Sequence, residues 1–459
     1  MTDKWPDESD EWADEPGDQE LSDTAIETDV DSKISDDPSG QRLVALLPDG
    51  RRLVLSGAGA GATVFDGTDT TVAGPTIRDR DDALASGAPP IMLLHRPHQA
   101  AGVIQRLSAS IVAATRGGVS LGVAAMLPDS SEATVTQWLS AHPAAALRLA
   151  DPGCFRMDPT LVRISDLSDR ALRWAPYLGQ DEIDVGELLD RQRFAGANLF
   201  LSSGRALDPT SPQRSLDTVF TSADEALSKL QAGERMALNL TMSTQWLAST
   251  ALREMLFAQL VDQEQFDLWH IRVQWPAALR AFQQPTDANL LAGYKRLGQL
   301  AYDEERRLLL PQTGSTGWLQ LGFGATGFGA GPFGAGQAFK EYSQGGGGGT
   351  TPVPRYFEPS LLHYVERSVH EALSSQSDYE TCDCPYCAAL LAAVDWNHEL
   401  ARLHGLHWLG RLAALQTTSG RPIEAVVRRS VRAAIAAAES QPLAGISSPQ
   451  HLRAWDRLL

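Results

Sequence analysis

Short apolar runs alternate with segments of helical periodicity along most of the chain. The first apolar pair, residues 42–57, reads as a hairpin with its turn at Pro48-Asp49-Gly50. Further short runs typical of buried strands occupy residues 89–97, 119–127, 145–155, 197–204, 236–243, 266–276 and 306–324. Segments with the apolar spacing of helices lie between them, at residues 98–118, 130–143, 222–233, 244–263 and 286–305. For the helix at 222–233, Ser222 is the expected N-cap.

This alternation predicts an α/β fold with a parallel sheet and helices outside it. About seven strand-then-helix units favour a closed (β/α)8 TIM-like barrel over an open doubly wound sheet. In such a barrel, chemistry is expected from polar residues at the carboxyl ends of strands. The candidates there are His95, Asp151, Ser202, Ser203, Thr241, Ser243 and Gln274. Each is also compatible with simple capping of a strand end.

A glycine-rich stretch, residues 322–349, interrupts the pattern. Gly322, Gly324 and Gly327 match the G-x-G-x-x-G spacing of a dinucleotide-binding turn, with Glu341 as a candidate ribose ligand. Pro332 and further glycines follow, so no helix is expected there to receive a pyrophosphate. We therefore interpret residues 322–349 as a flexible loop on the phosphate side of the barrel, and Gly345–Gly349 as a linker.

Three of the four cysteines, Cys382, Cys384 and Cys387, lie within six residues. Thiolates at this C-x-C-x-x-C spacing favour a zinc site over a redox pair or small buried side chains. A histidine from the following helical segment would complete a closed, structural site, with His404 or His407 as candidates and His398 as a weaker one. The sequence therefore predicts a helical zinc-binding subdomain at residues 376–459.

Composition separates the N-terminus from the rest of the chain. Residues 1–40 carry 15 acidic residues against Lys4 and Lys33, which accounts for most of the formal net charge of −18. We expect this segment to be a disordered acidic tail, with the barrel at residues 41–375. The tail is unlike a secretory signal, no apolar run is long enough for a membrane span, and few cysteines suit the cytoplasm.

Two stretches together resemble the tRNA-guanine transglycosylases. In that family a C-x-C-x-x-C cluster precedes a histidine in a phrase of the type His-Asn-Leu-x-Tyr/Phe, and by this match His404 is the zinc ligand. The segment 147–156, LRLADPGCFR, is similar to the family's strand-end phrase Asp-Ser-Gly-Gly-Phe-Gln, which places Asp151 in a base-binding pocket. The resemblance implies a barrel, a structural Zn²⁺, and exchange of guanine for a 7-deazaguanine base in tRNA or DNA. It also implies a homo- or heterodimer.

The chain departs from the family at the nucleophile. The family's attacking aspartate lies between the last glycine-rich strand and the zinc cluster, where this sequence has only Asp378 between Leu308 and Tyr379. If base exchange occurs, Asp208, which follows the strand 197–204, is the expected substitute, whereas Asp267 begins its strand and lies at the wrong end.

The alternative is a catalytically inactive barrel that binds nucleic acid or a nucleobase, or regulates a partner. Arg421, Arg428, Arg429 and Arg432 form either a phosphate-binding stripe or a solvated helix face.

Overall fold

The computed structural model describes three N-terminal strands, at residues 41–46, 52–56 and 62–65, and then residues 78–459 with gaps. The gaps are residues 98–100, 159–168, 181, 277–278, 280–281, 333, 342–352, 378 and 442. The predicted acidic tail and the predicted linker Gly345–Gly349 lie outside the described residues. The first three strands, β1 (Gln41–Leu46), β2 (Arg52–Ser56) and β3 (Ala62–Phe65), form an antiparallel sheet, which confirms the predicted hairpin.

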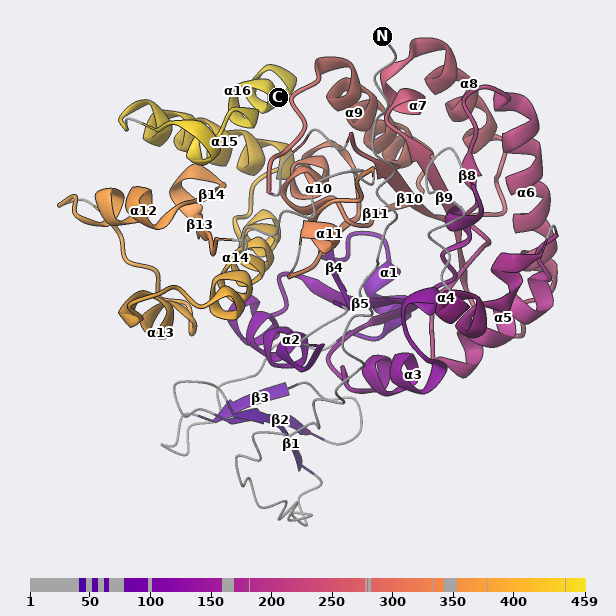
Figure 1. Cartoon of the computed structure of the whole chain (residues 1–459), viewed down its shortest axis with the longest axis horizontal. Coiled ribbons are helices and arrows are strands. Elements are labelled where there is room, and N and C mark those ends of the chain that lie inside the picture. Colours follow the sequence, from indigo (N-terminus) through magenta and orange to yellow (C-terminus); the bar gives the residue numbers. More distant parts are fainter. Residues whose placement is uncertain are drawn as a thin grey trace, which may run out of the picture.

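Parallel strands at eight positions form a nearly closed barrel (Figure 1). They are β4 (Ile91–His95), β5 (Ser120–Met126), β6 (Leu147–Asp151), β7 (Phe200–Leu201) with its continuation β8 (Ala206–Leu207), β9 (Met236–Ser243), β10 (Leu268–Gln274), β11 (Arg307–Leu310) and β12 (Gly327–Ala330). Strand β12 pairs with β4, while backbone hydrogen bonds from Asn198 and Leu199 to the Arg148 carbonyl bridge β6 and β7. The predicted α/β barrel is confirmed at this level.

Helices surround the strands (Figure 1). In chain order they are α1 (Arg80–Leu84), α2 (Ala101–Thr115), α3 (Glu132–Ser140), α4 (Asp169–Trp174), α5 (Val185–Phe194), α6 (Pro212–Ser228), α7 (Gln245–Ala248), α8 (Thr250–Val261), α9 (Ala288–Asp303) and α10 (Gly314–Gln320). The predicted start of a helix at Ser222 was wrong. Helix α6 begins ten residues earlier, because Pro212 suits a first helical turn, and Ser222 lies inside it.

Side chains that point into the barrel divide it into an apolar floor and a polar upper layer. The floor is a cluster of buried apolar residues from seven strands, from α1 and from the residue before β7: Leu84, Ile91, Leu93, Ala124, Leu147, Leu149, Leu199, Leu201, Ala237, Leu268 and Leu309. Above it, towards the carboxyl ends of the strands, lie buried polar side chains that include Asp151, Asn239, Thr241, His270 and Arg272. Period-two alternation along each strand explains both layers, since residues two apart face the same side.

The predicted strand over residues 318–324 and the predicted loop at 322–349 were both wrong in part. Residues 314–320 form α10, a 3-10 turn (Leu321–Phe323) follows, and Gly327–Ala330 is β12, the last strand of the barrel. Glycines there lead into a strand and not into a helix, which removes the dinucleotide-binding interpretation. Small residues in β12 fit because this strand closes the barrel between β4 and β11.

The C-terminal region packs against one side of the barrel (Figure 1). It contains the antiparallel pair β13 (Tyr356–Glu358) and β14 (His363–Val365), and helices α12 (Arg367–Ser374), α13 (Cys387–Ala392), α14 (His398–Thr418), α15 (Ile423–Glu439) and α16 (His451–Leu458). Helix α14 lies against α2, and β13 lies against α14. Among the described residues, no helix has both the length and the hydropathy needed to cross a bilayer.

Candidate functional site

Four side chains from the C-terminal region converge on one point. Cys382 and Cys384 lie in the loop before α13, Cys387 is the first residue of α13, and His404 lies in the second turn of α14. Their ligand atoms all lie within 4.8 Å of one another, so the cluster could bind a metal ion. Cys384, Cys387 and His404 are buried, and Cys382 is half-buried. The four predicted ligands are therefore brought together.

The imidazole of His404 is oriented towards the sulfurs by a backbone contact. Its Nδ1 lies 3.9 Å from Cys382 Sγ, 3.3 Å from Cys384 Sγ and 3.1 Å from Cys387 Sγ. Its Nε2 lies 2.7 Å from the Phe357 carbonyl oxygen, which can only accept a hydrogen bond. The proton is therefore on Nε2, and the Nδ1 lone pair is free to bind a cation.

The close approach of the three sulfurs shifts the pKa values of their thiol groups in opposite directions. Hydrogen bonds from the Cys384 and Cys387 thiols lower the pKa of Cys382 far below its usual value. The same contact with Cys382 raises the pKa of Cys384 to about 12, and contacts with Cys382 and Cys384 raise that of Cys387 further. Three thiolates at this spacing repel one another, so full ionisation requires a positive charge at their centre.

A shell of donors surrounds the sulfurs. The Trp408 indole donates to Cys382 Sγ at 3.0 Å, and the Cys384 backbone N–H donates to the same atom at 3.3 Å. The Tyr356 hydroxyl lies 3.3 Å from Cys387 Sγ, and its ring stacks on that of His404 with centroids 4.1 Å apart. Such contacts fix the ligands and stabilise negative charge on sulfur.

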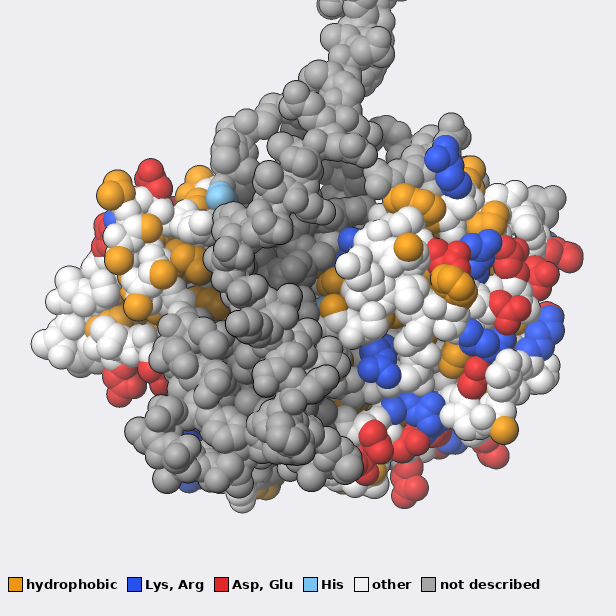
Figure 2. All heavy atoms as spheres, turned by 90° about the horizontal axis from the view of Figure 1, so that it is seen from below, with side chains coloured by type: hydrophobic (Ala, Val, Ile, Leu, Met, Phe, Trp, Pro, Cys, Tyr) orange, Lys and Arg blue, Asp and Glu red, His pale blue; other side chains and the backbone are white. Residues whose placement is uncertain are grey.

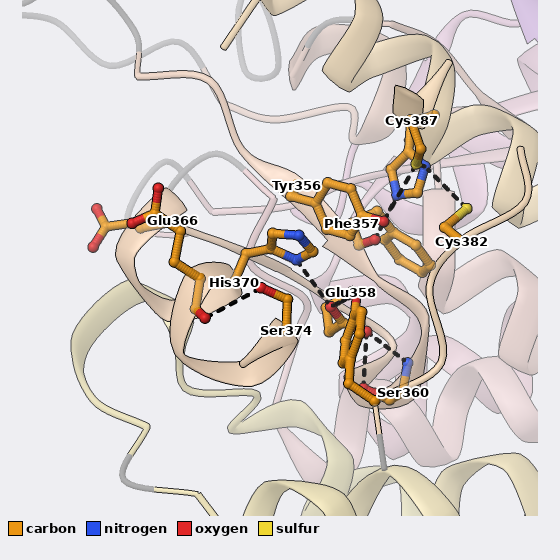
Figure 3. Close-up of polar contacts among 12 residues, drawn as sticks. Tyr356, Phe357, Glu358, Ser360, Glu366, His370, Ser374, Cys382 and Cys387 are labelled. Atoms are coloured by element: carbon orange, nitrogen blue, oxygen red, sulfur yellow. Dashed lines mark hydrogen bonds and ion pairs between the residues drawn. The ribbon is translucent and has the colours of Figure 1, made fainter. Parts of the chain in front are cut away.

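Behind Tyr356 lies a buried carboxylate, Glu358 (Figure 3). It accepts hydrogen bonds from the Ser360 hydroxyl at 2.9 Å and the Tyr379 hydroxyl at 3.1 Å, and lies 3.4 Å from His370 Nδ1. The His370 ring packs against Tyr356 with centroids 4.1 Å apart and the two planes tilted by 39°. The cluster is thus backed by satisfied polar groups that hold β13 against α12.

The other two candidate histidines are not part of the cluster. His407 lies one turn after His404, and its Nδ1 lies 3.1 Å from the Ser110 hydroxyl of α2. His398 is the first residue of α14, before the turn that carries His404. Only tertiary packing separates these roles, because His404 and His407 are three residues apart on the same helix.

Asp151 lies at the carboxyl end of β6, inside the barrel, where the sequence predicted it. Its carboxylate pairs with the Arg272 guanidinium from β10 and accepts the Gly153 backbone N–H at 2.9 Å. Burial alone would raise the pKa of Asp151, but attraction to Arg272 and these hydrogen bonds hold it below its usual value. Asp151 is therefore an ionised carboxylate whose charge is already matched by Arg272.

Two further histidines line the polar layer. His270 Nδ1 lies 2.8 Å from Asn239 Oδ1, and His95 Nε2 accepts the Gln312 backbone N–H at 3.2 Å. Burial and then repulsion from Arg272 lower the pKa of each to about 3, although Asp151 partly opposes this. Both rings are therefore neutral at neutral pH.

The remaining candidate carboxylates do not join Asp151. Asp208 directly follows β8, at the same end of the barrel, and its Oδ1 accepts hydrogen bonds from the Thr210 N–H and hydroxyl, both at 2.8 Å. This is a local turn that leads into α6. Asp267 precedes β10 at the opposite end and pairs with Arg235 on the surface.

The last barrel strand provides no carboxylate and no room for one. At Gly329, a Cβ atom would lie 2.4 Å from His95 Nε2 and 2.7 Å from the Gln312 backbone nitrogen. Real Cβ atoms do not approach this closely. Any side chain at this position of β12 would require His95 and the 311–312 backbone to move.

Sequence reasoning missed Arg272, Tyr356 and Trp408. Arg272 had a usable signal, since a cation within the apolar strand LWHIRVQ must be paired if that strand is buried. Tyr356 had none, because it lies 31 residues before Cys387 on a separate element. Trp408 follows His404 by one helical turn, a spacing that places both on one face.

No protein-family model matches the chain, and no curated protein matches its sequence.

Proposed function

We propose that this chain is a divergent relative of the tRNA-guanine transglycosylases that has lost base exchange and acts as a non-catalytic subunit. One observation carries the proposal: at Gly329, in the last barrel strand, a Cβ would lie 2.4 Å from His95 Nε2, so no nucleophile fits there. The pairing of Asp151 with Arg272 adds to it, because a buried carboxylate whose charge is already paired with a guanidinium is a poor nucleophile towards a sugar carbon.

The family relationship is supported by architecture and by the cysteine cluster, and is itself part of the proposal. A nearly closed parallel barrel carries a C-terminal Cys3His cluster, as the sequence resemblance implies, although the gap from Cys387 to His404 is shorter than in that family. Asp151 is at the strand end where that resemblance places a base-binding carboxylate.

We propose zinc as the metal of the cluster. Three thiolates and one neutral imidazole are a typical tetrahedral zinc donor set. With Zn–S bonds of about 2.3 Å and a Zn–N bond of about 2.0 Å, a tetrahedral site has N···S distances of about 3.5 Å, and His404 Nδ1 lies 3.1–3.9 Å from the three sulfurs. Four protein ligands leave no open position, so bound zinc would tie the loop at 382–387 to α14 and would not take part in chemistry.

We propose that the partner is a protein, either a second copy of this chain or a catalytic relative. Beside the cluster, α13 and the following turn expose apolar side chains, of which Val394 is 87% and Leu391 is 37% exposed. Figure 2 shows hydrophobic side chains gathered on the lobe at this side, whereas acidic and basic side chains are interspersed over the barrel flank opposite. An exposed apolar patch of this kind is typical of protein interfaces.

Nucleic-acid binding has weaker support. The four arginines of the α15 region line a surface cavity of about 550 Å³, but Arg428 pairs with Glu424 and Arg432 with Asp456. These pairs reduce the positive charge that a phosphate backbone would meet. We propose a cytoplasmic location, because reduced thiols are needed to hold the metal.

The deciding experiment is exchange of labelled guanine into bulk tRNA and into genomic DNA by the zinc-loaded full chain. We expect no incorporation into either polymer. Incorporation would overturn the proposal. It would instead support the second candidate, a base-exchange enzyme acting on tRNA or DNA and a 7-deazaguanine base, because Asp151 and Asp208 both lie at the carboxyl end of the barrel. In that case Asp151→Asn should abolish incorporation with zinc content unchanged.

A second experiment tests the interface. Light scattering coupled to size exclusion should give a dimer for the chain alone, or a complex with a catalytic relative, and the double variant Leu391→Glu/Val394→Glu should abolish it. Exposed Tyr302, which is 74% exposed on α9, offers the matched control Tyr302→Glu. Assembly that survives in the Leu391 and Val394 variant would exclude this surface.

A further inference from the structure

The Arg272 side chain is fully enclosed in a cage built by other elements. Its side chain is 0% exposed, and the Asp151 side chain is 6% exposed. Nη2 pairs with Asp151, Nε donates to Gln312 Oε1 at 2.8 Å, and Nη1 donates to Thr241 Oγ1 at 3.3 Å. Oxygen atoms from three separate parts of the chain therefore surround the edge of one planar guanidinium group.

Aromatic rings cover the same group. The guanidinium carbon lies 4.8 Å from the centroid of the Phe155 ring and 5.7 Å from that of Phe339. The two rings meet edge to face, with centroids 5.0 Å apart and an interplanar angle of 74°. A planar cation that has acceptors around its edge and lies close to two aromatic rings is bound both by charge and by cation–π attraction.

Asp151 and Phe155 also have contacts that do not involve Arg272. The Gly153 backbone N–H donates to Asp151, and Phe155 is buried with Ala206 in a small apolar cluster that Met126 and Phe339 cover. The guanidinium group that fills the cage belongs to Arg272, whose aliphatic side chain extends from β10. The carboxylate and the Phe155 ring therefore have support of their own beside the position that the guanidinium occupies.

We propose that Asp151, Thr241, Gln312, Phe155 and Phe339 form a receptor for a planar guanidinium-type cation, which this chain fills with its own Arg272. Arg272 thereby determines which ligands the barrel can bind, since it excludes from Asp151 any other planar group that could donate hydrogen bonds to the carboxylate. The alternative is an ordinary buried ion pair that stabilises the barrel without selectivity for shape. The inference concerns the same barrel site as the proposed function, but its readout is ligand-dependent stability, so it stands or fails separately from base exchange.

The test uses the full zinc-loaded chain with Arg272→Ala, which empties the cage and leaves Asp151. Thermal unfolding is measured in about 5 mM guanidinium chloride, far below the molar concentrations that denature proteins. Equal concentrations of sodium chloride and of urea are the controls, since urea is also planar but uncharged. The double variant Asp151→Asn/Arg272→Ala has the same cavity without the carboxylate, and wild type has the cavity filled.

We expect guanidinium to raise the Tm of Arg272→Ala by about 2 °C or more, as binding to the folded state alone requires. Urea should have no such effect, and neither wild type nor the double variant should respond to guanidinium. If Arg272→Ala folds only when guanidinium is present, the proposal is also supported. It is overturned if the single variant does not respond, if urea or the double variant gives an equal response, or if the single variant fails to fold in both conditions.

Discussion

The indole Nε1–H of Trp408 donates a hydrogen bond to Sγ of Cys382 at 3.0 Å. Cys382 is the half-buried cysteine of the cluster, and the Cys384 backbone N–H donates to the same sulfur at 3.3 Å. Two N–H donors aimed at one sulfur stabilise its thiolate form. Helix α14 supplies both this donor and His404, so one face of one helix provides a ligand atom and a hydrogen bond to a second ligand atom.

Replacing Trp408 with Phe should weaken zinc binding by about tenfold, because an outer contact to a ligand atom is lost while the ring is kept. Competition with a chromogenic chelator gives the affinity. Trp396→Phe is the matched control, since Trp396 packs on Tyr356 and His370 and its affinity effect should be negligible. Equal losses in the two variants would mean that the indole acts through packing alone.

Variants of the two neighbouring histidines of α14, His404 and His407, should differ clearly in zinc content. His404→Ala removes a ligand atom, so we expect purified protein to contain far less than one zinc per chain. His407→Ala should retain full zinc and lose about 1–2 kcal/mol of stability, because it breaks the contact with Ser110. Elemental analysis and urea unfolding check the pair. The reverse pattern of zinc content would contradict the assignment of His404.

Gly329→Ala should destabilise the barrel by about 1–3 kcal/mol, the usual cost of forcing an atom into a packed interior. The added Cβ would meet His95 Nε2 at 2.4 Å. Gly179→Ala is the control, because its Cβ would make only an ordinary contact of 3.5 Å with Leu172. Chemical unfolding of both variants measures the difference. If Gly329→Ala is as stable as its control, the crowding that carries the proposed function is absent.

Stability should fall as the pH is lowered from about 6.5. The pKa of His95 and of His270 is about 3 in the folded chain, chiefly because of burial, whereas an unfolded chain binds protons at its histidines near pH 6.5. As the pH falls, the unfolded state therefore binds protons first. Each of these two residues lowers the free energy of unfolding by about 1.4 kcal/mol for each pH unit below about 6.5. His142 and His363, with pKa values of about 4 from burial, contribute in the same direction.

Unfolding free energies between pH 7.5 and 5.0 measure this slope. His95→Gln keeps an acceptor for the Gln312 N–H but cannot titrate, so its slope should be smaller by about one proton. An unchanged slope would mean that His95 is protonated in the folded barrel.

The sequence by itself determined the features that are local in the chain. Alternating apolar runs and helical segments predicted the barrel, because burial on a strand or helix repeats with the period of that element. The spacing of Cys382, Cys384 and Cys387 brought three sulfurs to one turn, and the strand that ends at Asp151 was correctly placed. Each of these depends on residues less than about ten positions apart.

Only the tertiary structure decided which groups meet across long separations. It chose His404 over His407, because α14 packs its His407 face on α2. It paired Asp151 with Arg272, 121 residues later, and turned the glycine-rich segment at 327–330 into the strand that closes the barrel. Local pattern does not encode such contacts, since the neighbours that satisfy a buried charge or fill the space beside a glycine come from other strands. The same packing left no room for a side chain at Gly329, because His95 from another strand lies beside it.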